Sequence, residues 1–104
     1  MNEYERVKKL VQKKMKIKDI SVECRQQSYV KARYMYFKLC QQLLRHNFKN
    51  VECSTVVNRK QEMVLYGIGE FDNLIDTSYY ADISDLYSEC VLELDLNTSE
   101  NNNY

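Results

Sequence analysis

Residues 29–45 read YVKARYMYFKLCQQLLR, and this stretch decides the fold class. Its apolar side chains recur at helical spacing and form an unusually wide stripe: Val30, Met35, Phe37, Leu39, Cys40, Leu43 and Leu44. A stripe of this width predicts a helix that is buried on more than one side, as the central helix of a small bundle is. Ser28 is the residue type expected to cap its start.

Shorter periodic stretches lie on both sides of this helix. Upstream, one helical face holds Tyr4, Val7, Val11 and Met15. Residues 18–22 then predict a short second element, with Asp19 as its N-cap, followed by a polar loop over residues 23–28.

Downstream, His46 and Asn47 break the pattern. Residues 48–55 predict a short helix with Phe48 and Val51 facing inward. Asn58 is a suitable cap for the next helix, whose apolar stripe is Val64, Ile68, Phe71 and Ile75. A last helix, capped by Asp82, carries Ile83, Leu86, Tyr87, Cys90, Val91 and Leu94.

Composition favours the same class. The 104 residues include no proline and two glycines, which argues against a turn-rich β fold. We therefore expect an all-α domain, a small bundle of about six helices over residues 1–96, with a disordered polar tail over residues 97–104. There is neither an apolar run of 18 residues nor a secretory signal, so we expect no membrane partner and a cytoplasmic location.

The formal net charge is zero, but the charges are unevenly distributed along the chain. Residues 1–75 hold all 15 Lys and Arg against 8 Asp and Glu, which gives +7, whereas residues 76–104 hold 7 Asp and Glu and no cation, which gives −7. This asymmetry predicts either a basic body that binds a polyanion or two ends that attract each other.

The sequence predicts no catalytic or metal centre. Cys24, Cys40, Cys53 and Cys90 are widely separated, and His46 is the single histidine. Because zinc sites need clustered ligands, we expect four reduced thiols, no metal and no cofactor. The Gly67-Ile68-Gly69 step lies in a helical pattern and lacks the third glycine of a dinucleotide loop, so we expect no enzyme.

A short helix, a tight polar turn and a longer helix that opens with polar side chains form the layout of a helix-turn-helix. The residues in this layout, read in order, resemble the C-terminal DNA-binding domain of the bacterial replication initiator DnaA, a Trp-repressor-like helix-turn-helix. The likeness lies in Val7 to Lys18, in Asp19 to Leu39, in the signature-like Asn58-Arg59-Lys60-Gln61-Glu62-Met63-Val64-Leu65-Tyr66, and in Asp82-Ile83. It spans residues 4–96.

Several residues depart from that family. Lys60-Gln61-Glu62-Met63 stands where the family has Asp-His-Thr-Thr, one residue is inserted between Val51 and Arg59, and the glycines of the family's turn are missing. The family joins this domain to an ATPase, for which this chain has no room. The resemblance therefore implies a reader module without its own ATPase.

The resemblance also implies roles for particular residues. Arg25 matches a loop arginine that enters the minor groove, and Gln27 stands at the family's second loop arginine. Arg59 matches the signature arginine that opens the recognition helix, where Lys60, Gln61 and Glu62 follow. Positions that contact the DNA backbone are matched or neighboured by Arg33, Tyr34 and Lys49. For Tyr34, core packing is an equal alternative.

The sequence thus predicts a module that binds double-stranded DNA with sequence preference and regulates replication or transcription. The alternative is a protein-interaction or structural module of the same fold that has lost base reading and meets a partner through its acidic C-terminal helix. The two differ in one feature: convergence of Arg25, Arg33, Arg59 and Lys60 on one surface favours DNA.

Overall fold

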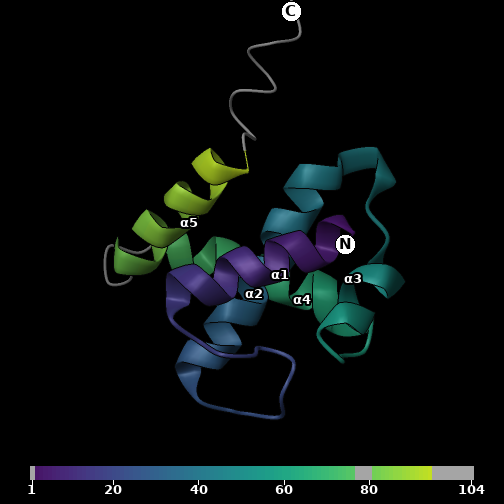
Figure 1. Ribbon diagram of the computed structural model, residues 1–104, viewed down its shortest axis with the longest axis horizontal. Coiled ribbons are helices and arrows are strands. Elements are labelled where there is room, and N and C mark those ends of the chain that lie inside the picture. The colour runs from purple at the N-terminus through teal and green to yellow at the C-terminus, as the bar shows by residue number, and fades with distance from the viewer. Residues whose placement is uncertain (1, 77–80, 95–104) are drawn as a thin grey trace, which may run out of the picture.

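The structure, a computed structural model, describes residues 2–76 and 81–94 and confirms the all-α class (Figure 1). Within these ranges it contains α1 (Glu3–Met15), α2 (Gln27–Leu44), a 3₁₀ turn η1 (Arg45–Asn47), α3 (Asn50–Val56), α4 (Glu62–Ile75) and α5 (Ala81–Glu93). The polar tail predicted over residues 97–104 lies outside the described residues.

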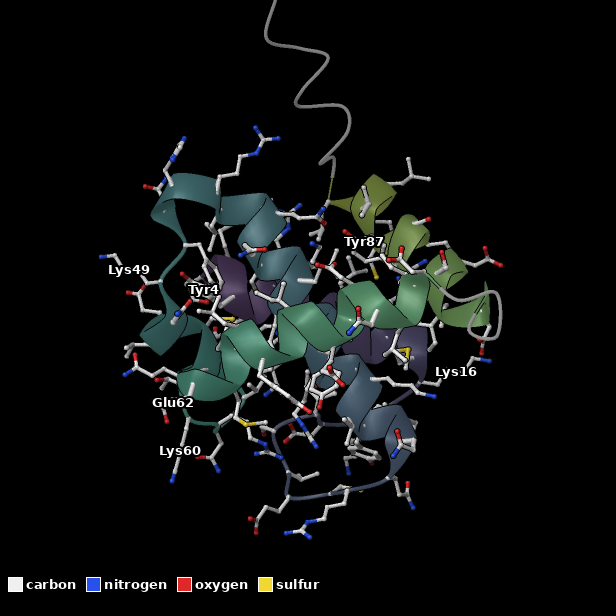
Figure 2. The ribbon with its side chains drawn as sticks, turned by 180° about the vertical axis from the view of Figure 1, so that it is seen from behind. Tyr4, Lys16, Lys49, Lys60, Glu62 and Tyr87 are labelled. Carbon is white, nitrogen blue, oxygen red and sulfur yellow. The ribbon has the colours of Figure 1, made fainter. Side chains whose placement is uncertain are left out.

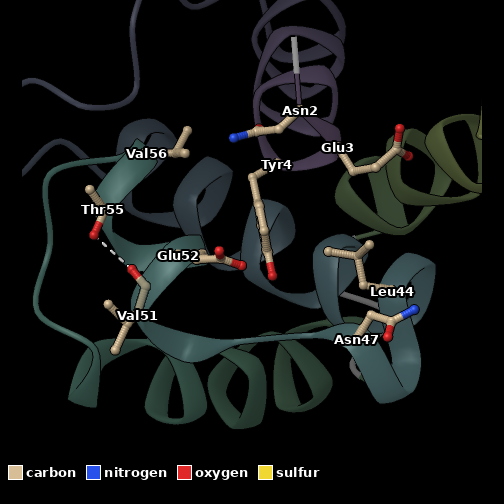
Figure 3. Close-up of a pocket in the computed structure, with 9 residues that line it drawn as sticks. All are labelled: Asn2, Glu3, Tyr4, Leu44, Asn47, Val51, Glu52, Thr55 and Val56. Carbon is tan, nitrogen blue, oxygen red and sulfur yellow. Dashed lines mark hydrogen bonds between the residues drawn. The ribbon is translucent and has the colours of Figure 1, made fainter.

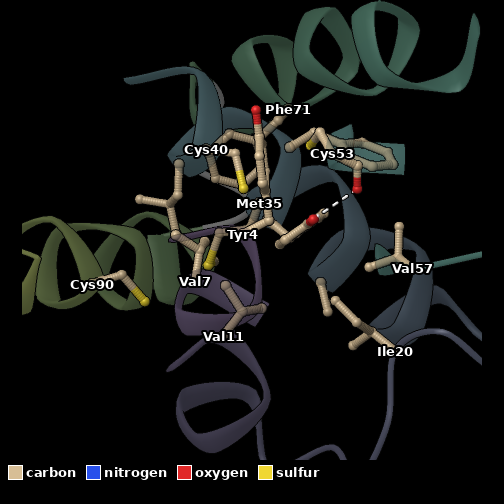
Figure 4. Packing of buried hydrophobic residues seen from close by; sticks show 14 of the residues in the cluster. Tyr4, Val7, Val11, Ile20, Met35, Cys40, Cys53, Val57, Phe71 and Cys90 are labelled. Carbon is tan, nitrogen blue, oxygen red and sulfur yellow. Dashed lines mark hydrogen bonds between the residues drawn. The ribbon is translucent and has the colours of Figure 1, made fainter. Parts of the chain in front are cut away.

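The central helix is α2, as its wide stripe predicted. It packs against α1, α3, α4 and α5, and it buries Met35, Tyr36, Phe37, Leu39 and Cys40 almost completely. Side chains from every other helix meet these residues in a single core, which Figure 4 shows from close by. In Figure 1, α3 and α5 lie on opposite sides of this centre.

The outer helices bury the faces that their spacing predicted. Tyr4, Val7 and Val11 are buried on α1, while Met15 is partly buried. On α4 the buried stripe is Val64, Ile68 and Phe71, with Ile75 partly buried. On α5, Ile83, Cys90 and Val91 are buried, and Phe71 meets Tyr87 at 5.1 Å between ring centroids.

The two oppositely charged ends of the chain meet at one point. Lys14 of α1 forms an ion pair with Glu89 of α5 at 3.1 Å and a second one with Glu93. The alternative that the two ends attract each other therefore has a structural counterpart.

The short element predicted over residues 18–22 is not a helix. The Asp19 carboxylate accepts hydrogen bonds from the backbone N–H and the hydroxyl of Ser21, at 2.9 and 2.6 Å, and so closes a turn. Arg33 binds carbonyls of the same segment that a helix would use. Residues 16–26 are consequently one long loop, anchored by the buried Ile17 and Ile20.

Besides Asp19, the other three predicted N-caps were also wrong. The helix assigned to Ser28 begins at Gln27, after Gln26, which makes no side-chain cap. Asp82 lies within the first turn of α5. Asn58 ends α3 with a left-handed φ of 56°, a conformation that asparagine adopts more readily than most residues.

Candidate nucleic-acid interface

The candidate interface is built on α3, the turn over residues 57–61, and α4. The backbone N–H of Asn58 donates to Thr55 O, and that of Arg59 donates to Ser54 O, both at 3.0 Å. With Asn58 left-handed, these bonds form a Schellman motif that stops α3 sharply. The chain then turns into α4, which packs against α3, so the predicted helix-turn-helix layout is present.

Of the two side chains predicted to face inward around α3, Phe48 and Val51, the prediction for Val51 was wrong. Val51 is 57% exposed, whereas Cys53 and Ser54 are buried. At 3.6 residues per turn, Val51 lies about 200° around the helix from Cys53, so both cannot face the core. Phe48, which precedes the helix, is partly buried as expected.

Arg59 does not lie in α4, the helix to which the resemblance gives the recognition role, because α4 begins three residues later at Glu62. Its guanidinium donates to Val22 O at 2.8 Å and to Asn58 O at 2.9 Å, with longer bonds to Ser21 O and Val57 O at 3.3 Å. Arg59 therefore ties the turn before α4 to the loop before α2.

Arg33 makes the same kind of attachment from α2. It is 8% exposed, and its guanidinium donates to Cys24 O at 2.8 Å, Ile20 O at 3.1 Å and Val22 O at 3.4 Å. Burial, and secondarily the nearby charge of Arg59, lowers the pKa of the Arg33 guanidinium. Because Val22 O accepts from both arginines, they converge on one segment of backbone.

These two attachments determine where the exposed candidates lie. Arg25 follows Cys24, whose carbonyl Arg33 holds, and Lys60 follows Arg59. Both Arg25 and Lys60 are exposed, as are Gln27, Gln61 and Glu62. The loop and the opening of α4 thus form one continuous end of the molecule, which we call the loop–α4 end: residues 22–27 and 59–63.

Lys49 and Tyr34 lie outside this end. Lys49 is exposed just before α3, and its backbone N–H donates to the hydroxyl of Tyr4 at 2.9 Å. Figure 2 shows Lys49, Glu62 and Lys60 along one edge of the molecule, with Lys16 at the other. Tyr34 is partly buried, and its ring meets that of Tyr66 edge-on at 6.2 Å, so it packs α2 against α4, as its alternative predicted.

Chemically, the loop–α4 end offers hydrogen-bond donors and positive charge. Arg25 and Lys60 form no ion pair with any described residue, and Gln61 can present an amide to a base edge. Glu62 adds one carboxylate. Together, Arg25, Lys60 and Gln61 can contact phosphates or base edges, and the loop that carries Arg25 is already fixed in place.

A pocket of about 440 Å³ on the other side of α3 does not extend this interface (Figure 3). Its walls come from the start of α1, the end of α2 with η1, and α3, and include Leu44, Val51 and Val56. None of the described residues that line it is cationic, and Glu3 and Glu52 add carboxylates, so this lining does not favour phosphate.

The described residues form neither a metal site nor a disulfide. Within residues 2–76 and 81–94, no three His, Cys, Asp or Glu side chains are grouped so as to hold a metal ion. The four cysteines are free thiols there, and Cys40, Cys53 and Cys90 are buried in the core, where burial raises the pKa of Cys90 to about 11. No helix in the described part of the chain is long and apolar enough to cross a membrane.

Two residues of the signature-like segment for which no role was predicted are exposed on α4. Leu65 and Tyr66 are 58% and 56% exposed, and they stand off the buried stripe of Val64, Ile68 and Phe71. That offset could be predicted from the spacing of the stripe.

Comparison with family models, with curated proteins and with solved structures yields no match to this chain. The resemblance to the DnaA domain therefore stays a prediction from the residues.

Proposed function

We propose that this domain binds double-stranded DNA through the loop–α4 end and acts in the regulation of replication or transcription. The observation that carries the proposal is the attachment of the Arg25 loop at two points: Arg33 ties it to α2, and Arg59 ties it to the turn before α4. It supports a site in which a loop arginine and the first turn of a second helix approach a duplex together. Helix-turn-helix proteins contact base edges with the N-terminal residues of that helix.

In this proposal the four arginines and lysines divide into two pairs. Arg33 and Arg59 are positioning residues, since their guanidinium groups are engaged by backbone carbonyls. Arg25 enters the minor groove, where a guanidinium suits a narrow, electronegative A·T-rich stretch. Lys60 contacts phosphate, and Gln61 pairs with a base edge in the major groove.

The test is a competition assay over a randomised duplex pool with purified full-length chain. Arg25→Ala should weaken binding mainly on A·T-rich sites, and Gln61→Ala should relax preference at one base pair, at a cost of about 1–3 kcal/mol. Lys49→Ala should weaken all duplexes nearly alike, because a phosphate contact carries no sequence information. Uniform losses for Arg25→Ala and Gln61→Ala would leave a nonspecific binder.

The matched control removes the same charge elsewhere. Lys9 and Lys13 are exposed on α1 and are not among the residues of the loop–α4 end. A Lys9→Ala/Lys13→Ala protein should retain most of the affinity that Arg25→Ala/Lys60→Ala loses. Failure of the native chain to bind any duplex at low salt would refute the proposal.

A second candidate function, the protein-interaction module, is favoured by one observation. Helix α4 contains Glu62, Glu70 and Asp72 but no Lys or Arg, and Leu65 and Tyr66 are exposed on it. Along its whole length α4 therefore lacks the positive charge that DNA phosphates attract, and Lys60 precedes the helix.

A further inference from the structure

The chain has two glycines, both on α4, and the fold requires only one of them. A Cβ at Gly67 would lie 2.7 Å from Cδ2 of Phe37 and 2.8 Å from Cδ1 of Tyr34, both on α2. These distances are too short for a real side chain. Gly67 is therefore explained by the close packing of α4 against the central helix.

Gly69 has no such explanation. A Cβ there would meet nothing within 4 Å, and the residue is exposed. Glycine inside a helix is less favourable than alanine by roughly 0.5–1 kcal/mol, because it loses more backbone freedom on folding. The fold would thus be more stable with alanine, and the missing side chain leaves open space on the surface of α4.

The neighbours of this open space on α4 are apolar or aromatic and largely exposed. Leu65 and Tyr66 lie four and three residues before Gly69, so all three share one helical face. Both side chains are more than half exposed, and Met63 is 39% exposed. The ring of Tyr34 supports Tyr66 from beneath, which holds its aromatic face in place. We call Leu65, Tyr66 and Gly69 the α4 outer face.

Charge around the α4 outer face is negative. Glu62, Glu70 and Asp72 are the charged residues of α4, and Lys38 of α2 pairs with Asp72 at 2.9 Å. Glu62 and Glu70 form no ion pair with described residues. Duplex phosphates would be repelled here, and so would an identical face of a second copy, because like charges would be brought together.

We propose that the α4 outer face docks an amphipathic helix of another protein, one whose apolar stripe is flanked by Lys and Arg. Gly69 lets the backbone of that helix approach α4 closely, Leu65 and Tyr66 pack against its stripe, and Glu62 and Glu70 pair with its cations. This is a helix-against-helix mode of recognition, in which the partner's apolar side chains recur at i, i+3 or i+4, and i+7.

The test uses two synthetic helical peptides that share one leucine stripe. One carries lysines on its flanks and the other carries glutamates. Each is titrated into the ¹⁵N-labelled full-length chain while amide shifts and peptide anisotropy are recorded. The lysine peptide should bind at least about tenfold more tightly, and its shifts should centre on residues 62–73. Equal binding of both peptides, or shifts centred on α5, would overturn the proposal.

Gly69→Gln is the decisive variant, because it fills the open space without touching the core. It should weaken lysine-peptide binding by about tenfold or more while the melting temperature is unchanged or higher. The matched control is Leu92→Gln on acidic α5, where Leu92 is 64% exposed; it should bind like the native chain. Native-like binding by Gly69→Gln would refute the docking face.

Two further readouts separate the alternatives. Sedimentation at rising concentration should show a monomer; self-association that Gly69→Gln abolishes would make a second copy the occupant and overturn the proposal. Duplex affinity should be the same for Gly69→Gln and the native chain, because the proposal does not rest on DNA binding. Arg25→Ala/Lys60→Ala should in turn bind the lysine peptide normally, so the two failures are distinguishable.

Discussion

The loop–α4 end and the α4 outer face differ in nearly every property, although both include residues of one helix. The first is fixed by hydrogen bonds from two guanidinium groups. Arg33 and Arg59 donate to loop carbonyls between Ile20 and Cys24, and Arg25 and Lys60 remain exposed. The second is apolar and open, with carboxylates around it and no cation on the helix.

On this difference we propose different partners for the residues just before α4 and for its middle. Positive charge and an amide at Lys60 and Gln61 favour a polyanion, whereas exposed Leu65 and Tyr66 beside Gly69 favour another helix. A helix-turn-helix layout therefore does not assign a single function to its second helix. The following variants test how far the two regions are separate.

The largest effect should come from the core beneath both regions. Phe71 is completely buried on the inner side of α4, and Phe71→Ala should lower the free energy of unfolding by about 3–5 kcal/mol. Leu65→Ala, on the opposite side of the same helix, should change it by less than about 0.5 kcal/mol. Chemical denaturation measures both, and similar losses would mean that the exposed face is packed.

The stability lost on replacing each arginine with alanine should increase with the burial of that arginine. Arg33→Ala leaves buried carbonyls without their charged donor and should destabilise the fold by about 2–3 kcal/mol. Arg59→Ala should cost less, about 1 kcal/mol, because Arg59 is only partly buried, and exposed Arg25→Ala should be neutral. Thermal melts give the order, and a loss for Arg25→Ala as large as that for Arg33→Ala would remove the division into positioning and contacting residues.

The glycines form a matched pair on one helix. Gly67→Ala should destabilise the fold by about 1–3 kcal/mol, since its methyl group meets the rings of Phe37 and Tyr34. Gly69→Ala should stabilise it by about 0.5–1 kcal/mol, because nothing lies in the way. A destabilising Gly69→Ala would show that the fold itself needs that glycine.

The smallest effect concerns pH and the loop. Hydrogen bonds from Ser21, and then Lys8, lower the pKa of the Asp19 carboxyl. A carboxyl whose pKa is lowered on folding stabilises the native state above its ordinary pKa, and that contribution disappears as the pH falls through the folded-state pKa. Between pH 6 and pH 3 the native chain should lose slightly more stability than Asp19→Asn, by less than about 1 kcal/mol. An equal loss of stability in both proteins would mean that groups other than Asp19 cause the acid sensitivity.

Most of the helical framework could be predicted from the sequence because burial repeats at fixed spacing. The stripes of α1, α2, α4 and α5 were assigned to the correct faces, from Val7 to Cys90. Caps were predicted poorly because one residue type serves several roles: Asn58 was expected to start a helix, but it ends one in the left-handed conformation.

The roles of Arg33 and Arg59 could not be predicted for a different reason. Their acceptors are backbone carbonyls of a loop, and every residue has a backbone carbonyl, so no side-chain pattern marks them. The sequence could name the four basic residues but not their arrangement in the fold. Arg33 and Arg59 both donate to Val22 O. Arg25 follows Cys24, whose carbonyl also accepts from Arg33, and Lys60 follows Arg59.

The central claim is that Arg25 and Lys60 neutralise DNA charge at the loop–α4 end. The direct measurement is the salt dependence of duplex affinity, by anisotropy at several salt concentrations, for the native chain, Arg25→Ala/Lys60→Ala and Lys9→Ala/Lys13→Ala. If each contact neutralises one phosphate, the log–log slope of the first variant should be shallower by about 1.8, whereas that of the control should match the native chain. A native slope in the first variant, or an equal change in the control, would contradict the account.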